Sequence, residues 1–510
     1  MTDSVLSVLL GPADDIDSVP QKVADHFSQL YQDVTQIPLL SVHNPPEAFP
    51  HRALVAFRAL VQDTSPSPEI YLARRPNGHC GGWGIADTRD ISDNVNYSDL
   101  REITVIWAVS IPGESPWCSA EGLAHLSHNP PRPHKYPLPG SPHIGVQVKI
   151  YDPRLAQGLK ASDICTFVGI LTKEPLYSED LDSSESIDLV PTLHVLFTRK
   201  TPPTITPRNF PIEPSLPNLR ATRDKLVTWI AKEALDGDKD AAKWVLLSAI
   251  AKTQSRTPPI YPPSLTLSSF PAPSDPSATP TLYHVLSLIL PIINILPLTL
   301  GTLNKTSFSP ESKNEDLHSG WLQVPHGSLY LLTETGVMEG IVLDKGIQNL
   351  RAVQGAITGQ TLDYIFPFSR FTFQTDISFV ILTGGKKSAF FQTSVNVPLD
   401  SGRDYDFYKP LDKINLPEGD LLDHWRNLVG GSKIGTVTIN DEVAQYIQDD
   451  FVKERKATGS GDKDLAITSD DLIRCMMTAR LLALSYHESL VTKDVWEEAK
   501  ALEARRKARS

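Results

Sequence analysis

The stretch GSLYLLTETGVMEGIVLDKGIQNLRAVQGAITGQTLDYIFPFSRFTFQTDISFVILTGGKKS, residues 327–388, decides the fold class of this chain. An apolar run from Leu329 to Leu332 leads directly into Thr333 and Glu334. In nucleotide-driven motors a Walker B strand of this kind ends in an acidic pair, which holds Mg²⁺ and polarises water. Here a threonine stands at the aspartate position. We therefore interpret Thr333 and Glu334 as a degenerate Walker B-like position without catalytic chemistry.

The phosphate-binding half of a nucleotide site is missing. The sequence contains no G-x-x-x-x-G-K-[ST] loop, whose backbone amides and lysine would cradle the phosphates. The run GGKKS, residues 384–388, is similar only superficially, because Val380 stands where the first glycine belongs and Lys387 stands where a hydroxyl is needed. We interpret this run as a turn. The sequence thus predicts no enzymatic activity, no cofactor, no metal ion and no small-molecule substrate.

Composition predicts a soluble, multidomain protein with protein partners. At 510 residues the chain exceeds what one hydrophobic core supports, and its 40% hydrophobic content is ordinary for folded domains. The net charge of −12 disfavours a long groove for DNA, which needs clustered lysine and arginine. The four cysteines are Cys80, Cys118, Cys165 and Cys475. Their wide spacing, without a C-x-x-C pair, indicates a reducing compartment and no disulfide framework.

Two segments bear on targeting. The start, MTDSVLSVLLGPADD, lacks the basic and long apolar regions of a secretory signal, so we expect the cytosol or the nucleus. Residues 282–300, LYHVLSLILPIINILPLTL, carry no acidic or basic side chain over nineteen residues, nearly enough to span a bilayer. Pro291 and Pro297 would break a membrane helix. We predict a buried helix up to Leu290 followed by a core strand, and no membrane partner.

The first 200 residues predict a helical segment followed by a small β-barrel. In residues 1–40 the apolar positions Val23, Phe27, Leu30 and Val34 recur at helical spacing. Residues 41–200 hold five or six short strands, in the runs ALVAFRALVQ, EIYLAR, EITVIWAVSIPGE, IGVQVKIYD, DICTFVGILT and TLHVLFTRK. Short strands separated by turns favour a closed barrel of the oligonucleotide-binding (OB) type.

The remaining chain predicts a linker, an α/β domain and a terminal helical bundle. Residues 201–219 are proline-rich and indicate a semi-rigid spacer. Residues 220–405 open with a helical hairpin that turns at Gly237, and then alternate strand and helix signals, which is typical of a largely parallel sheet. Residues 406–510 turn helical, with a last helix that Thr492 can cap. The expected fold class is therefore multidomain α/β plus β.

The helical end resembles the lid of AAA+ proteins, so the α/β domain would be a degenerate AAA+-like core. In a working ATPase such a lid can present an arginine to the nucleotide, and Arg474 and Arg480 lie on the helix in question. Because the phosphate loop is missing, we expect these arginines to be solvated or bound to a partner.

Several blocks together carry a resemblance to a known family. These are HSGWLQVPHGSLYLLTETGVMEG (318–340), GIQNLRAVQ (346–354), GQTLDYIFPF (359–368) and RLLALSYHESLVTKDVWEEAKALEARR (480–506). With VAFRALVQDTSPSPEIYLA (55–73) and RDKLVTWIAKEALDGDKDAAKWVLLSAIAK (223–252), they occur in the order of the mini-chromosome maintenance (MCM) complex-binding protein family. The chain resembles this family over nearly its full length.

This resemblance implies a nuclear, non-enzymatic partner of the replicative MCM helicase, itself distantly similar to an MCM subunit. Family members are linked to helicase assembly, unloading from chromatin and sister-chromatid cohesion, and so to DNA replication and cell division. The chain departs from the family at Thr333, where the family has an acid, at Ile365 in a Tyr-Asp-Phe-like triplet, and in the loop of residues 384–388. These departures weaken any residual nucleotide or magnesium site further.

Other candidate sites have simpler explanations. Cys118, His125, His128 and His134 form a Cys/His-rich patch, but their spacing does not suit zinc, and we favour a loop of solvated histidines. The basic end, residues 505–509, fits either a nuclear import signal or a favourable charge at a helix terminus.

Two other functions remain as alternatives. A single-strand-binding barrel would need exposed aromatic platforms, for which Tyr71, Trp107 and Tyr151 are available, although core packing is the better account. Direct nucleic-acid binding is therefore not expected. An active AAA+ ATPase is less well supported still, and measured turnover would separate it from an MCM-binding regulator.

Overall fold

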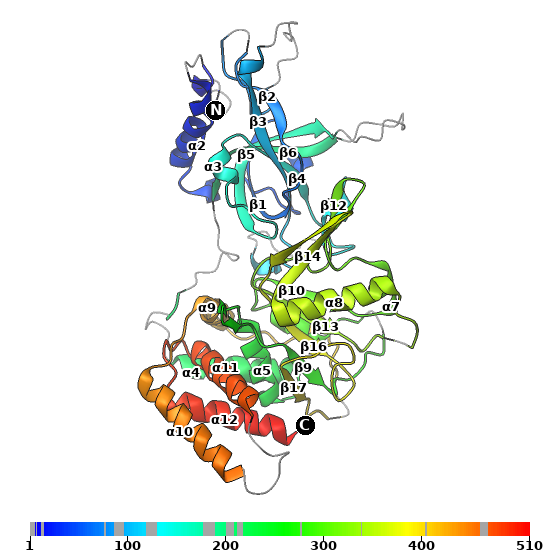
Figure 1. Ribbon diagram of the computed structural model, residues 1–510, viewed down its shortest axis with the longest axis vertical. Coiled ribbons are helices and arrows are strands. Elements are labelled where there is room, and N and C mark those ends of the chain that lie inside the picture. The colour runs from blue at the N-terminus through cyan, green and yellow to red at the C-terminus, as the bar shows by residue number, and fades with distance from the viewer. Residues whose placement is uncertain are drawn as a thin grey trace.

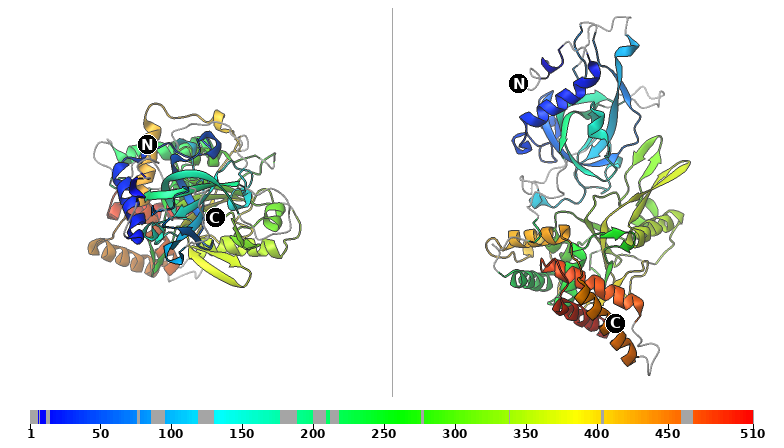
Figure 2. Two further views of the ribbon diagram at one scale, coloured as in Figure 1. Left: turned by 90° about the horizontal axis from the view of Figure 1, so that it is seen from above. Right: turned by 60° about the vertical axis from the view of Figure 1, so that its left-hand side comes forward.

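The computed structural model is a mixed α/β structure with several sheets (Figure 1). It describes residues 6, 8–11, 15–75, 78–85, 96–118, 130–176, 189–199, 209–211, 218–275, 278–337, 339–402, 405–458 and 468–509. Figures 1 and 2 show an elongated molecule, with the N-terminal strands at one end and the C-terminal helices at the other.

The N-terminal part is built on six strands. They are β1 (Ala53–Asp63), β2 (Glu69–Leu72), β3 (Leu100–Val109), β4 (Gly145–Ile150), β5 (Ile164–Pro175) and β6 (Leu189–Arg199). The order is β1-β5-β6-β4-β3-β2, and β3 also pairs with β1, with Leu60 opposite Val109. The β4–β6 pair is parallel, whereas the other pairs are antiparallel. The six strand runs predicted from the sequence are confirmed.

Short helical elements surround these strands. They are η1 (Ile16–Ser18), α2 (Val19–Leu30), η2 (Val34–Gln36), η3 (Pro46–Ala48), η4 (Tyr97–Asp99), η5 (Pro116–Cys118), η6 (Pro133–Lys135) and α3 (Pro153–Ala156). The amphipathic α2 buries Val23 and Phe27 among strand residues, as predicted. The predicted stripe is wrong beyond Phe27, because Leu30 is exposed at the helix end and Val34 lies in the separate turn η2.

A five-stranded parallel sheet forms the centre of the second part. Its strands are β9 (Leu265–Ser268), β10 (Ile293–Pro297), β13 (Ser328–Thr333), β16 (Ile377–Leu382) and β17 (Val395–Pro398). The order is β10-β13-β16-β9-β17, and every neighbouring pair is parallel. Between these strands come α6 (Thr281–Ser287), α7 (Leu300–Lys305) and α8 (Asp344–Gly359).

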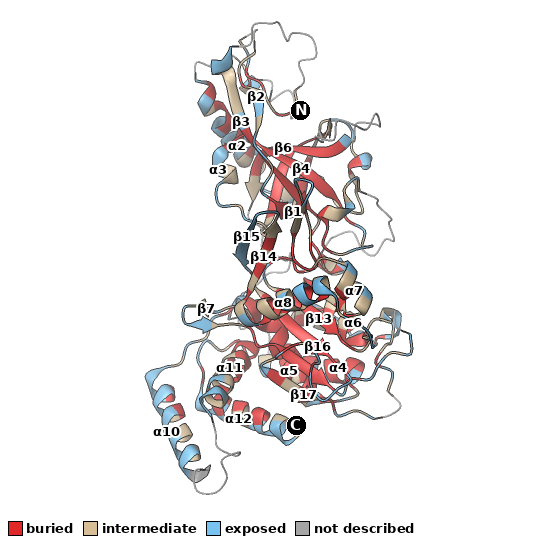
Figure 3. Cartoon of the chain, turned by 45° about the vertical axis from the view of Figure 1, so that its right-hand side comes forward, coloured by how far each residue is buried: buried red, intermediate tan, exposed pale blue. Residues whose placement is uncertain are grey.

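Both faces of this sheet are covered, which explains why its strands are continuous apolar runs. Along β13, Leu329 and Leu331 join one hydrophobic cluster, while Tyr330 and Leu332 join another with Val353 of α8. Figure 3 shows these strands as the buried centre of the molecule. The predicted largely parallel sheet is thus confirmed, with β13 at the Walker B-like position.

Six longer helices complete the first of these clusters. They are α4 (Leu219–Ala234), α5 (Lys239–Ile250), α9 (Leu421–Ile434), α10 (Asp441–Thr458), α11 (Ser469–Ser485) and α12 (Lys493–Ala508), with the short turn η7 (Leu411–Lys413). The predicted α4–α5 hairpin is confirmed. The predicted cap of α12 is confirmed as well, because the Thr492 side chain accepts a hydrogen bond from the Val495 amide.

A second, smaller sheet stands beside the parallel one. It consists of β11 (Glu311–Lys313), β12 (Asp316–His318), β14 (Thr361–Phe366) and β15 (Ser369–Gln374), in the order β12-β11-β14-β15. A two-stranded ribbon, β7 (Ser255–Arg256) and β8 (Pro259–Ile260), precedes β9. The small sheet carries the side chains that meet the N-terminal strands.

The apolar segment of residues 282–300 divides into α6 and β10, as its prolines predict. Leu290 and Pro291 lie between the two elements and are buried. Within the part of the chain that the structure describes, no helix has the length and hydropathy needed to cross a membrane.

Part of the proline-rich linker is docked on the helices. Of residues 201–219, the structure describes 209–211 and the last two. The Phe210 ring lies 5.2 Å from the His487 ring. A Cβ atom at Gly431 would lie 2.4 Å from the Asn209 carbonyl oxygen, so only glycine leaves room for the linker here. At this point the linker that the sequence predicts to be a semi-rigid spacer is held against α9.

Candidate functional site

Thr333 and Glu334 lie at the carboxyl end of β13, in the interior of the parallel sheet. Thr333 pairs with Pro297 of β10 on one side and with Leu382 of β16 on the other. Both side chains are buried, with exposed fractions of 9% for Thr333 and 7% for Glu334. In open parallel sheets this edge is where ligands usually bind.

The Glu334 carboxylate is already occupied by donors of the same chain. It accepts hydrogen bonds from the Ser388 hydroxyl and, at 3.0 Å, from the Ala389 amide. The Glu334 amide in turn donates to the Leu382 carbonyl at 2.9 Å. Glu334 therefore fastens the loop after β16, which contains the GGKKS run, to the end of β13. Both oxygens of this carboxylate therefore accept a hydrogen bond from within the chain.

In nucleotide-binding parallel sheets a phosphate loop can follow the strand that corresponds to β9. Here the first amides after β9 are hydrogen-bonded within the chain. The Ser269 amide donates to the Gly385 carbonyl at 3.0 Å, and the Phe270 amide donates to the Thr383 carbonyl at 2.9 Å. The Phe270 side chain is buried and packs edge-on against Phe407, with 5.2 Å between ring centroids. The first backbone amides after β9, which would have to face an anion, thus serve the fold.

The two lid arginines nominated from the sequence differ in their contacts. Arg474 forms ion pairs with Asp471 and, at 3.4 Å, with Glu503, and 21% of its side chain remains exposed. Arg480 lies on the same helix and lines a pocket between α11 and the parallel sheet. Its Nε atom is buried without a hydrogen-bond acceptor among the described residues.

The basic end of α12 is tied to the start of α5. Arg505 forms an ion pair with Asp240 at 2.9 Å, and Arg509 forms one with Asp238 at 2.6 Å. Asp238 is the N-cap residue of α5 and accepts hydrogen bonds from the Asp240 and Ala241 amides. The basic residues therefore have a structural use, beyond the two interpretations left open by the sequence.

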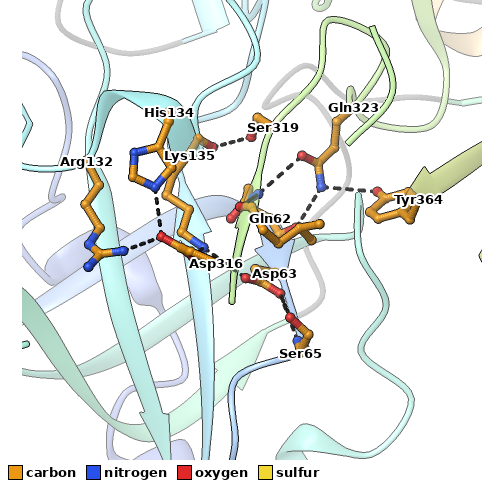
Figure 4. Close-up of polar contacts among 11 residues, drawn as sticks. Gln62, Asp63, Ser65, Arg132, His134, Lys135, Asp316, Ser319, Gln323 and Tyr364 are labelled. Atoms are coloured by element: carbon orange, nitrogen blue, oxygen red, sulfur yellow. Dashed lines mark hydrogen bonds and ion pairs between the residues drawn. The ribbon is translucent and has the colours of Figure 1, made fainter. Parts of the chain in front are cut away.

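A buried cluster of charges joins the N-terminal strands to the small sheet (Figure 4). The Lys135 ammonium, which is 2% exposed, donates to Asp63 of β1 at 2.9 Å and also pairs with Asp316 of β12. Arg132 pairs with Asp316 as well, and His134 Nε2 lies 2.8 Å from the same carboxylate. Burial acts to raise the pKa of Asp316, but the His134 hydrogen bond and the nearby cations outweigh it and hold the pKa well below its usual range.

Two glutamine side chains also connect the N-terminal strands to the second part of the chain. The Gln62 side chain donates to the Leu317 carbonyl at 3.1 Å, and the Gln323 side chain donates to the Gln62 carbonyl at 2.6 Å (Figure 4). Gln323 also donates to the Tyr364 hydroxyl at 3.1 Å. Burial raises the pKa of Tyr364 to about 12, so the phenol stays protonated at neutral pH. Sequence reasoning missed this contact, because its partners lie far apart in the chain.

The loop after β3 makes a third connection between the two parts. The Ser115 amide donates to the Pro291 carbonyl at 2.9 Å, and the Trp117 indole donates to the Ser287 carbonyl at 2.8 Å. At Gly113, which has a φ of +72°, a Cβ atom would lie 2.1 Å from Oδ1 of Asn294, so glycine is required. This loop fixes the N-terminal part to the α6–β10 connection.

Of the Cys/His-rich patch, the structure describes Cys118 and His134, and these two side chains make different contacts. The Cys118 thiol is buried and contacts the Pro291 carbonyl at 3.6 Å, whereas His134 contacts Asp316. The His134 side chain is 30% exposed, and its ring also contacts the charged cluster through Asp316. His125 and His128 lie outside the described residues.

The aromatic side chains considered as nucleic-acid platforms belong to the interior. Trp107 and Tyr151 are both buried, and Tyr71 packs edge-on against Tyr151, with 5.0 Å between ring centroids. The core-packing interpretation is confirmed for Trp107 and Tyr151.

A further polar group lies inside the N-terminal strands and was not expected from the sequence. His194 Nε2 lies 2.7 Å from the Glu174 carboxylate, and its Nδ1 lies 2.8 Å from the Tyr151 hydroxyl. Burial lowers the pKa of His194. Burial would raise the pKa of Glu174, but the contacts with His194 and Lys149 hold it at about 2. The one sign of this polar group in the sequence was His194, a single histidine within the apolar run TLHVLF. We interpret the contacts of His194 with Glu174 and Tyr151 as part of the packing of these strands.

Comparison with known proteins gives one family and a consistent set of relatives. The sequence matches the family described as Mini-chromosome maintenance replisome factor over residues 121–510. A Mini-chromosome maintenance complex-binding protein of Gallus gallus is 27% identical over 416 residues, which cover 75% of this chain and 64% of the relative. The protein of that name from Salmo salar is 24% identical, covering 90% of this chain and 88% of the relative.

Further relatives of the same name come from other organisms. The Homo sapiens protein of the same name is 25% identical over 488 residues, which cover 85% of this chain and 73% of the relative. The Arabidopsis thaliana protein is also 25% identical and covers 83% of this chain. The chain thus spans less than two thirds of the Gallus gallus relative and more of the others. Because the family match extends over most of its length, this chain belongs to the Mini-chromosome maintenance replisome factor family.

Proposed function

We propose that this chain is a non-enzymatic protein that binds subunits of the MCM complex. Its relatives are named for binding that complex. The non-enzymatic part of the proposal rests mainly on Glu334, whose carboxylate is hydrogen-bonded to the loop after β16. The Ser269 and Phe270 amides also support this part of the proposal, because each donates its hydrogen bond to a backbone carbonyl of the chain. Protein binding then remains the function that family membership supports.

The pairing of the strands supports a finer description of the fold as part of this proposal. In the N-terminal part the pairing runs β1-β5-β6-β4-β3 and returns to β1, with β4 parallel to β6, which supports a closed OB-type barrel. In the parallel sheet the strand that comes first in the chain lies between the fourth and the fifth, which supports an AAA+-type core with a helical lid. The proposed boundaries stay at residues 40, 200, 219 and 405.

A subunit-like shape suggests how such a protein could act on the helicase. Ring-forming subunits associate through repeated faces, so a chain of similar shape can occupy one position in a heterologous ring. Because Glu334 and the first amides after β9 are hydrogen-bonded within the chain, ATP bound to this chain would not contribute to its contact with a neighbouring subunit. That contact would depend on protein–protein binding alone. We propose that this contact biases MCM assembly and unloading from chromatin, and thereby DNA replication and sister-chromatid cohesion in the nucleus. Nuclear accumulation of a fluorescent fusion would test the location.

Nucleotide-free binding is the experiment that tests the proposal. Purified chain and purified MCM subunits from the same organism are mixed after treatment with apyrase, and complexes are measured by interferometry. We expect binding to at least one subunit, and no ATP turnover by the chain alone. A failure to bind any MCM subunit would refute the proposal, and turnover comparable to that of an MCM ring would refute its non-enzymatic part.

We propose no direct nucleic-acid role. The net charge of −12 and the burial of Trp107 and Tyr151 support this view, because single-strand binding relies on cationic grooves and exposed aromatic faces. A salt titration with a fluorescent oligonucleotide is the test. Affinity that falls steeply as salt rises would revive the single-strand-binding alternative.

A further inference from the structure

A pocket of about 440 Å³ lies between helix α11 and the parallel-sheet part of the chain. Four segments line it: residues 259–264 at and after β8, the end of α8, the segment before β17, and the middle of α11. A pocket of this size accommodates one or two side chains of a partner. It lies away from Thr333 and Glu334, which are absent from its lining.

Apolar side chains dominate the pocket. Ile473 of α11 stands at the pocket with 61% of its surface exposed, although its chemistry favours burial. Met476 and Met477 continue this side, and Ile260 and Ile357 contribute from the other segments. Methionine adapts its shape to different partners, so such walls are common at protein-binding surfaces. Exposed apolar surface of this kind indicates an interaction site.

Several hydroxyl groups of the lining are hydrogen-bonded within the chain. The Ser264 and Ser394 hydroxyls lie 3.1 Å from each other, and the Thr358 hydroxyl donates to the Gln354 carbonyl at 2.8 Å. Arg480 is the one charged residue among those that line the pocket. Its Nε is buried without an acceptor in the described part of the chain.

Arg474, six residues earlier on the same helix, provides a contrast within α11. Its guanidinium is matched by Asp471 and Glu503. For Arg480, by comparison, no acidic partner is found among the described residues. A buried N–H group without an acceptor loses hydration with no compensation, and a carboxylate supplies that compensation through charge-assisted hydrogen bonds. The pocket is therefore complementary to an acidic group next to an apolar one.

We infer that this pocket binds a segment of an MCM subunit in which an apolar side chain packs against Ile473 and Met477 and a neighbouring Asp or Glu pairs with Arg480. The inference rests on the proposed function and names the surface that performs it. A single cation in an apolar wall suits one carboxylate better than a nucleic acid or a nucleotide, whose phosphates need several cationic groups. Arginine in a pocket of this kind is a frequent binding hot spot.

Two variants of the full-length chain test the inference, with one matched control. Arg480→Glu reverses the charge, and Ile473→Asp places a charge on an exposed apolar position where folding is little affected. Arg351→Gln on α8 is the control, because Arg351 is exposed and has no role in the pocket. The affinity for the MCM subunit that the unmodified chain binds is measured by interferometry, and folding is checked by circular dichroism.

We expect each pocket variant to weaken binding about tenfold or more, whereas Arg351→Gln stays within about twofold. Arg480→Lys should recover part of the affinity, because it restores the charge without the planar fork. A photo-cross-linker at position 473 should capture an MCM peptide with an acidic residue beside an apolar one. Unchanged affinity in both variants would overturn this inference and leave MCM binding intact, whereas no binding by the unmodified chain would overturn the proposed function itself.

Discussion

At the scale of single residues, Glu334 is the side chain on which the non-enzymatic interpretation depends. Glu334→Gln replaces one acceptor oxygen by a donor that faces the Ser388 hydroxyl or the Ala389 amide. We expect the free energy of unfolding to fall by about 1–2 kcal/mol, the usual cost of an unsatisfied buried donor. Thermal and urea unfolding would measure this loss.

Glu339→Gln is the matched control for this change, because Glu339 is exposed a few residues further along. Its stability should stay within about 0.5 kcal/mol of that of the unmodified chain. A catalytic carboxylate without structural partners would give the opposite result, with Glu334→Gln as stable as the unmodified chain.

Lys135 is a deeply buried cation in the contact between the two parts. Lys135→Met leaves Asp63 and Asp316 facing one another without their shared cation. Removing one partner of a buried ion pair costs about 3–5 kcal/mol, so the melting temperature should fall markedly. Lys173→Met is the comparison, because Lys173 is half exposed and lies 3.5 Å from Glu47. That surface change should cost less than about 1 kcal/mol, and equal losses in the two variants would contradict the account.

The charge of Asp316 makes this contact dependent on pH. Its folded-state pKa lies below the ordinary value, so its contribution is fully present above the unfolded-state pKa of about 4 and is lost as the pH falls toward the folded-state value. Asp316→Asn removes the titrating group. The difference in stability between this variant and the unmodified chain should therefore be large at pH 7 and shrink below about pH 4. A constant difference across pH 3–7 would show that the ionised carboxylate contributes nothing.

At the scale of elements, the linker and α9 form a testable contact. Gly431→Ala would place a Cβ atom 2.4 Å from the Asn209 carbonyl oxygen and 2.5 Å from the His487 ring. We expect the linker to detach, with faster hydrogen exchange in peptides that contain Phe210. Gly355→Ala in α8 is the control, because nothing lies within 4 Å of its Cβ position. That change should stabilise the chain by about 0.5–1 kcal/mol and leave the linker unaffected.

The elements differ in how far the sequence could predict them. The strands β10, β13 and β16 are apolar on both faces, so their runs could be recognised directly. The carboxyl end of β13 could be located as well, because the apolar run Leu329–Leu332 stops directly before Thr333. The partners of Glu334 could not, since Ser388 lies 54 residues further along and only the sheet brings the two together. The same holds for Lys135 and Asp316, whose pairing depends on how two separately folded sheets meet.

The small sheet was missed for a different reason. Arg370 to Gln374 do alternate polar and apolar side chains, but all six residues of β15 are exposed, so this strand has no buried face that ties it to a core. It is held by pairing with β14, where Phe371 lies opposite Tyr364. Backbone pairing with a buried neighbour, which composition does not reveal, decides its structure.

At the scale of the whole molecule, the described residues join the N-terminal part to the rest at several points. These include the charged cluster around Lys135, the amide group around Gln323, and the loop of Ser115 on the α6–β10 connection. Because the contacts involve both sheets of the second part, the two parts should move together. A chain of this kind would present both layers to a neighbouring subunit in a fixed arrangement, as the proposed ring position requires.

The affinity of the purified chain for MCM subunits, with and without nucleotide, tests the central claim most directly. Interferometry would be run after apyrase treatment and again with ATP and Mg²⁺, using subunits that cannot hydrolyse ATP. Since the edge at Glu334 is closed, we predict the same dissociation constant in both conditions and no nucleotide bound by the chain alone. Binding that appears only when this chain itself has taken up ATP would contradict the account.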